Sequence, residues 1–377
     1  TQTFERDRSD LLELQRDLAR AIVAELPIVL DDATLANAIR TGTINAEAFD
    51  LFLQARASVT ARHGKAGLAR AEALLAAAIE LDPQYYTARS ILAFMKLNLA
   101  TLPGGSSAKT AVANTIATLK DIERLDLGGT RPYREIQLID LALLQGDWPR
   151  AEALVREQLK QSAPETYWFT RYAELLLTSG AMAPAIAYLQ AAEEIEPLNT
   201  QIKLQFAKLY HYTRRIEQIA EKADACLALN PNHSDCMGYK ARTLAVSGEL
   251  DRALAMIRGA AWDSSSTRCY FRMLAGQSCD PNLQLDPTVP TANADILMLR
   301  GDYDATFRQL NHAIDDRRVW EQFRALAHSW PDDFKADPRW PRLLQEIGLT
   351  DEWRTEICRR AATLEPYTQI AVDCHLR

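Results

Sequence analysis

Three stretches that share one layout decide the fold: LLQGDWPRA at residues 143–151, LLTSGAMAPA at 176–185 and AVSGELDRA at 245–253. In each stretch an alanine stands five residues after a glycine. Gly146 and Gly180 are 34 residues apart, and Gly248 lies twice that interval beyond Gly180. A fixed period with regularly spaced breaks is typical of a repeated structural unit.

The residues between these breaks predict helices. Pro197 and Pro231 keep the period of 34 and would end successive units, and Arg214 stands where the unit between them lacks its glycine. Extended alternating runs are hard to find, whereas residues 10–30 place leucine and isoleucine at helical spacings. We therefore expect an all-α solenoid of antiparallel helix hairpins, each burying one face by stacking on its neighbours.

The repeats resemble the tetratricopeptide repeat family, whose unit has 34 residues and carries small residues where its two helices cross. Alanines occupy these positions: Ala151, Ala185 and Ala253 in the second helices, and Ala173, Ala207 and Ala241 in the first helices. An earlier unit at 46–83 has Ala71, Leu75 and Ala78 in phase with Pro83. The resemblance implies a right-handed superhelix whose first helices line a concave groove.

The same resemblance implies which side chains face the groove. It assigns nine residues of the first helices to this surface: Tyr133, Asp140, Tyr167, Glu174, Gln201, Lys208, His211, Asp235 and Arg242. Their mixture of aromatic, acidic and basic groups suits a protein or peptide ligand, with the aromatics as anchors and the charges setting register. The alternative is a solvated face that binds nothing in particular.

Charge and hydropathy argue against two kinds of partner. The net charge of −7 does not favour direct binding of nucleic acid, which usually requires a basic surface. The sequence contains no apolar run of the roughly 18 residues that a membrane span needs. We expect association with a membrane only through a span upstream of Thr1.

The sequence predicts three regions. Residues 1–44 would form an N-terminal helix that packs on or leads into the repeats, residues 45–261 the repeat solenoid, and residues 262–377 irregular, cysteine-containing helical repeats and a cap. Three segments resemble those flanking the repeats of bacterial winged-helix regulators of the ToxR and CadC type or of adenylate cyclases: LLELQRDLARAIVAEL at 11–26, NAEAFDLFLQARA at 45–57 and FKADPRWPRLLQEIGL at 334–349. This resemblance implies a sensor or interaction region whose output domain lies outside the chain. The alternative is a self-standing periplasmic scaffold or adaptor.

We expect no catalytic residue, no cofactor and no metal site. The sequence has no glycine-rich phosphate loop, no H-E-x-x-H and no C-x-x-C. His233 stands between Cys226 and Cys236, but structural zinc sites usually have four ligands in paired short spacings.

The six cysteines fall into three neighbouring pairs. Cys226 and Cys236 are ten residues apart, as are Cys269 and Cys279, and Cys358 and Cys374 are separated by sixteen. We expect three sequential disulfides and therefore a periplasmic location, because disulfides persist in oxidising compartments. The alternative is six buried thiols in a cytoplasmic protein, since free cysteine packs as a small apolar residue.

Overall fold

The structure, a computed structural model, contains helices and no strands in the part of the chain that it describes. That part comprises residues 43, 45–60, 64–101, 108–124, 131–161, 165–260, 262–280, 283–285, 290–315 and 330–363. Eighteen helices lie in these ranges, which confirms the all-α prediction. None of them combines the length and the hydrophobicity that crossing a bilayer requires. The predicted helix at 1–44 lies outside the described residues, apart from Thr43.

The chain divides into two compact units: residues 1–99 with 113–138, and residues 100–112 with 139–377. The division falls within the predicted solenoid, so the predicted boundaries at 44/45 and 261/262 remain predictions. Five helices occupy the first part of the chain: α3 (Ala46–Thr60), α4 (Gly64–Leu81), α5 (Tyr86–Thr101), α6 (Ala108–Arg124) and α7 (Arg131–Leu144).

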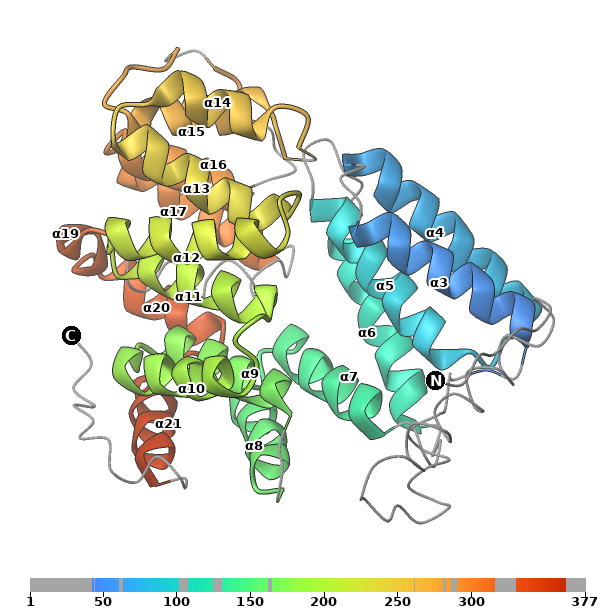
Figure 1. Ribbon diagram of the computed structural model, residues 1–377. Coiled ribbons are helices and arrows are strands. Elements are labelled where there is room, and N and C mark those ends of the chain that lie inside the picture. The colour runs from blue at the N-terminus through green and yellow to red at the C-terminus, as the bar shows by residue number, and fades with distance from the viewer. Residues whose placement is uncertain are drawn as a thin grey trace. The chain divides into compact units, whose positions relative to one another are not determined.

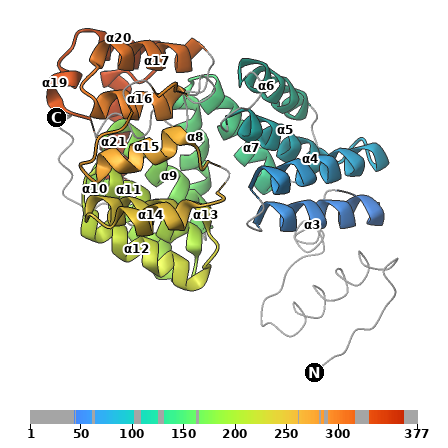
Figure 2. The same cartoon turned by 90° about the horizontal axis from the view of Figure 1, so that it is seen from above.

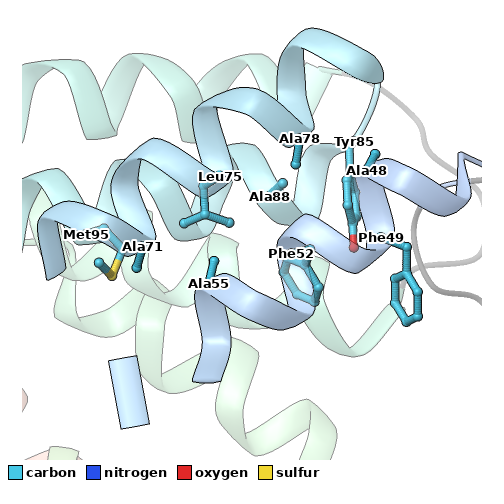
Figure 3. Close-up of a cluster of buried hydrophobic side chains, with 10 residues drawn as sticks. All are labelled: Ala48, Phe49, Phe52, Ala55, Ala71, Leu75, Ala78, Tyr85, Ala88 and Met95. Carbon is cyan, nitrogen blue, oxygen red and sulfur yellow. The ribbon is translucent and has the colours of Figure 1, made fainter. Parts of the chain in front are cut away.

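The first unit is built on an alanine-rich core. Leu75 of α4 lies among side chains of α3 and α5 and is fully buried (Figure 3). The rings of Phe52 and Tyr85 pack with their centroids 5.3 Å apart. Alanines such as Ala71 and Ala78 let the helices approach closely, because they add no side chain beyond Cβ.

The second unit contains the regular hairpins (Figure 1). Its first seven complete helices are α8 (Trp148–Leu159), α9 (Thr166–Ser179), α10 (Met182–Ile195), α11 (Thr200–Tyr212), α12 (Ile216–Leu229), α13 (Ser234–Val246) and α14 (Leu250–Ile257). α9 packs on α10, α11 on α12 and α13 on α14. Each small residue at a predicted crossing is buried, including Ala185 and Ala207 at 0% exposure. The structure thus has the stacked hairpins that the repeat period predicts.

The turns within the hairpins confirm the repeat register. Gly146, Gly180 and Gly248 have φ of 74°, 94° and 84°, the left-handed conformation that glycine adopts without a steric cost. Arg214 has φ of 56° at the equivalent position and is the one non-glycine residue with positive φ among those described. Each turn has the same backbone hydrogen bond across five residues: Asp147 N to Ala142 O, Ala181 N to Leu176 O, Arg215 N to Tyr210 O, and Glu249 N to Leu244 O.

The C-terminal helices fold back along the second unit. They are α15 (Ser265–Leu274), α16 (Pro290–Leu299), α17 (Tyr303–Asp315), α19 (Asp332–Lys335), α20 (Arg339–Glu346) and α21 (Asp351–Thr363). α16 and α17 form another hairpin, with Gly301 in its turn at φ of 74°. α20 packs beside α17 (Figure 2), and α21 reaches α8, α9 and α10 at the start of the unit (Figure 1).

Candidate functional site

A row of polar and aromatic side chains runs along successive first helices of the repeats. Arg171 of α9 donates a hydrogen bond to Glu174 (2.9 Å) and another to Asp140 of α7. Gln205 of α11 donates from Nε2 to the other carboxylate oxygen of Glu174 (2.7 Å). The carboxylates of Asp140 and Glu174 are therefore held by partners from their own or the next repeat.

Burial and charge fix this part of the row. Asp140, Glu174 and Gln205 are at most 9% exposed. Burial opposes the charge of Arg171, but the carboxylate of Asp140, followed by Tyr167 and Glu174, more than offsets this effect and raises the pKa of the guanidinium above its ordinary value. Arg171 thus stays charged, and replacing it would leave two buried carboxylates without their cation.

A second cluster continues the row into α13. The guanidinium of Arg242 lies over the ring of Tyr239 (5.0 Å to the centroid) and that of Tyr270 (5.7 Å). His211 packs against Tyr239 at 5.7 Å between centroids. We call these seven residues the polar row: Asp140, Arg171, Glu174, Gln205, His211, Tyr239 and Arg242.

Two titratable groups beside Arg242 have shifted pKa values of opposite sign. Burial, and then the charge of Arg242, lower the pKa of His211 to about 3, so its imidazole stays neutral. Burial raises the pKa of Asp295 to about 6, although Arg242 and the indole of Trp330 favour its charged form. The indole Nε1 donates to Asp295 Oδ1 at 3.4 Å.

The structure separates eight of the nine predicted groove residues into two groups. Asp140, Glu174, His211 and Arg242 belong to the polar row, where other side chains of the protein surround them. Gln201 and Asp235 are exposed, while Tyr167 and Lys208 are half-buried. The side chain of Tyr133 is outside the described part. Asp140 and Glu174 are each engaged by Arg171, and the assignment of the nine residues to a ligand-binding groove stays a prediction.

The repeat resemblance does not predict the contacts of Arg171 and Gln205. The spacing of the residues indicates both contacts, because Asp140 and Arg171 are 31 residues apart and so are Glu174 and Gln205. This is three residues less than the repeat. Side chains that far apart in sequence meet between adjacent first helices.

A second set of contacts that the sequence does not predict joins the two ends of the second unit. Glu152 of α8 is 2% exposed, and its carboxylate accepts hydrogen bonds from Trp353 Nε1 (3.1 Å) and from Arg360 Nε (2.7 Å) of α21. Trp148 packs on Trp353 with centroids 5.8 Å apart and donates from Nε1 to Ile347 O at 2.6 Å. We call the contacts among Trp148, Glu152, Trp353 and Arg360 the C-terminal seam.

Two glycines lie in backbone contact beside the C-terminal seam. A Cβ on Gly348 would lie 2.6 Å from the carbonyl oxygen of Gly146, and Gly348 also has φ of 79°. Any other residue at 348 would push the C-terminal turn away from the first hairpin turn.

A cleft of about 810 Å³ lies between α19, α20 and α21. Its walls combine the apolar Trp340 and Leu344 with Lys335 and Arg354. Each cation is paired within its own helix, Lys335 with Asp332 at 2.9 Å and Arg354 with Asp351 at 3.1 Å. The cleft is thus close to neutral and does not select the charge of a ligand.

Two of the three predicted disulfides join cysteines that both lie in the described part of the chain, and the structure contains both of these. Cys226 is bonded to Cys236 and Cys269 to Cys279, with Cα atoms 6.3 Å and 5.4 Å apart. These two pairings are confirmed. Cys358 is buried, and its predicted partner Cys374 lies outside the described residues, so that pair stays a prediction.

Comparisons with known proteins identify no family. No protein-family description matches the sequence, and no curated protein matches it significantly. Several solved structures are similar to this chain, and each of the three named next covers 94% of it. A human IFIT1 dimer with m7Gppp-AAAA is 11% identical, with 77% of its chain covered and a TM-score of 0.47. The APC/C hetero-tetramer Cut9-Hcn1 is 13% identical, with 74% covered and a TM-score of 0.40. The P58(IPK) TPR domain is 14% identical, with 99% covered and a TM-score of 0.26. Similarities of this strength carry no argument about function.

Proposed function

We propose that the chain is a protein- or peptide-binding module and the sensor or interaction region of a larger bacterial regulator. The output domain would lie outside these residues. The observation that carries the binding role is the polar row, in which charged and aromatic side chains of successive first helices hold one another in place.

The polar row differs from a face built only for packing. Burying charged groups costs free energy unless they are paired, so an array that needed nothing but stability would place apolar residues there. The row supports a preformed surface, whose side chains lose little further freedom when a ligand binds. Around it, Tyr167, Gln201, Lys208 and Asp235 retain exposed surface for contact with a ligand.

The experiment is a selection of random peptides on the purified chain, followed by affinity measurements on variants. Charge reversal at Lys208 or Asp235 should weaken the selected peptides at least tenfold, about 1.4 kcal/mol. Arg252→Glu is the control, because Arg252 is 70% exposed in α14, a second helix of its hairpin, and pairs with Glu249 alone among the described residues. Equal affinities for all three variants would exclude the first-helix surface as the binding site.

Arg242 is not a suitable probe of binding. Its guanidinium lies between two tyrosine rings and near the carboxylate of Asp295, so we expect a charge reversal there to disrupt folding as well as binding. Lys208 and Asp235 avoid this ambiguity.

A periplasmic location and the absence of a catalytic role are parts of the same proposal. The two disulfides support an oxidising compartment. The net charge of −7 supports a protein rather than a nucleic-acid partner. Alkylation of the protein taken directly from its native cells tests the location, since thiols at Cys226 and Cys236 would contradict it. The alternative of a self-standing scaffold or adaptor uses the same surface, and the native reading frame distinguishes the two.

A further inference from the structure

Three potential metal ligands converge at the joint between two repeats. The sulfurs of Cys226 and Cys236 and a ring nitrogen of His233 all lie within 4.8 Å of one another. Both cysteines are 0% exposed. Nδ1 of His233 is buried and has no hydrogen-bond partner among the residues that the structure describes. A buried polar atom left without a partner is uncommon in folded proteins and points to a role for the imidazole.

The backbone holds these ligands in place independently of the disulfide. The amide of Asn230 donates to Cys226 O (2.9 Å), and that of His233 donates to Asn230 O (3.1 Å). The amide of Met237 donates to His233 O at 3.0 Å, which begins α13. α12 and α13 also pack along an apolar cluster that includes Ala223 and Tyr239. Breaking the bond between the sulfurs therefore leaves the turn and both helices with their other contacts.

We propose that reduction of the Cys226–Cys236 disulfide converts this cluster into a zinc site, with two thiolates and the imidazole of His233 as ligands. A dithiol reductant supplies two electrons and two protons and becomes a disulfide itself. Zn²⁺ then replaces the two thiol protons, which pass to solvent. Two cysteine sulfurs and one imidazole suit thiophilic d¹⁰ cations such as Zn²⁺ and Cu⁺.

Charge and geometry favour Zn²⁺ among these cations. Two thiolates neutralise Zn²⁺ but leave Cu⁺ with a net negative charge, which an apolar cluster disfavours. Zinc–sulfur bonds of about 2.3 Å and zinc–nitrogen bonds of about 2.0 Å place tetrahedral ligand atoms roughly 3.3–3.8 Å apart. The two sulfurs, which are bonded to each other in the disulfide, therefore separate on reduction, and the ring nitrogen already lies within 4.8 Å of both. His233 is half-buried, so water can complete the coordination from its exposed side. Zinc would then replace the disulfide as the cross-link between α12 and α13.

The second disulfide provides a matched control. Cys269 and Cys279 are also ten residues apart, but Nη2 of Arg300 lies 3.9 Å from each sulfur. A guanidinium at this distance repels a metal cation. Among the described residues, Cys226, His233 and Cys236 form the one cluster of this kind. Reduction of the second pair should create no zinc site.

The test uses the full chain, reduced anaerobically with a phosphine that is then removed. Co²⁺ serves as the spectroscopic probe, and Zn²⁺ and Cu⁺ are then compared in competition with a chelator. We expect one site, with thiolate-to-cobalt charge-transfer absorption and tetrahedral d–d bands, and displacement of Co²⁺ by Zn²⁺. The oxidised chain should not bind.

Three variants locate the site. C269S/C279S should bind as the wild type does, C226S/C236S should lose the absorption, and His233→Ala should bind at least tenfold more weakly. Unchanged binding in His233→Ala or C226S/C236S, or loss in C269S/C279S, would overturn the proposal. The proposal would also be overturned if the reduced wild type kept its circular dichroism but bound no Co²⁺. Loss of helicity on reduction would overturn it as well, because the site would then not be preformed. Tighter binding of Cu⁺ than of Zn²⁺ would overturn the choice of zinc.

Discussion

Breaking the ion pair between Glu152 and Arg360 should measure the stability that the C-terminal seam provides. The Glu152 side chain is 2% exposed, whereas that of Arg360 is 28% exposed and also bridges Glu356 at 3.2 Å. Arg360→Gln therefore removes the cation from a buried carboxylate, which keeps the indole of Trp353 as a donor. Loss of one member of a buried pair costs about 3–5 kcal/mol. Glu152→Gln should cost less, about 2 kcal/mol, because Arg360 can turn to Glu356 and water.

The assay is a double-mutant cycle followed by urea unfolding. It is monitored by tryptophan fluorescence, to which Trp148 and Trp353 contribute, and by circular dichroism of the helices. The double variant should show a coupling energy of about 1.5–3 kcal/mol. The control cycle uses Arg252 and Glu249, whose side chains are 70% and 43% exposed, so their coupling should stay below about 1 kcal/mol. Equal coupling in the two cycles, or a smaller cost for Arg360→Gln than for Glu152→Gln, would refute the reasoning.

Three further predictions concern the repeat turns, the helix crossings and the pH dependence. Arg214→Gly should raise the free energy of unfolding by up to about 1 kcal/mol, because a φ of 56° is unfavourable for a residue with a side chain. Gly248→Ala should lower the free energy of unfolding by about 1 kcal/mol. The cause is the backbone conformation and not a steric clash, since a Cβ at Gly248 meets no described atom within 4 Å. Ala185→Leu should cost about 1–3 kcal/mol in the same urea assay, because the site is fully buried where two helices cross. The pKa of Asp295 is raised to about 6, so its protonated form favours the fold, and the stability it contributes below about pH 4 is lost as the pH rises through about 6. The pKa of His211 is lowered to about 3, so its contribution has the opposite sign and is lost as the pH falls below about 6.5. Relative to wild type, Asp295→Asn should therefore gain stability as the pH rises from 4 to 6. His211→Gln should gain stability relative to wild type as the pH falls over the same range. If the stability difference from wild type had the same slope against pH in both variants, these assignments would be contradicted.

The features that the sequence predicts well are those that depend on near neighbours along the chain. A glycine turn, a small residue at a helix crossing and two cysteines ten residues apart are each defined within one hairpin or one joint. Arg214 shows how strong this constraint is, since it adopts the left-handed conformation of the glycine that its unit lacks. The register therefore follows from the period even where the residue type is wrong for the turn.

The polar row and the C-terminal seam depend on which side chains meet in space. Resemblance to a repeat family assigns Asp140 to an inner surface, but it does not reveal that Arg171 from the next repeat will occupy the carboxylate. The seam is harder still, because Trp148 and Ile347 are 199 residues apart and no local pattern links them. Neither the hydrophobic period nor the cysteine spacing contains information about such a contact.

The C-terminal seam changes how the second unit should respond to stress. In an open solenoid each repeat touches only its neighbours, so the ends can fray without disturbing the middle. Here α21 packs on α8, α9 and α10, so the first and last elements of the unit contact each other. The tryptophan pair and the buried carboxylate of Glu152 contribute stability only while both of these elements are folded. Asp140, Arg171 and Glu174 lie in the first repeats of this unit. We therefore expect a variant that breaks the C-terminal seam to destabilise that part of the polar row together with the ends of the unit.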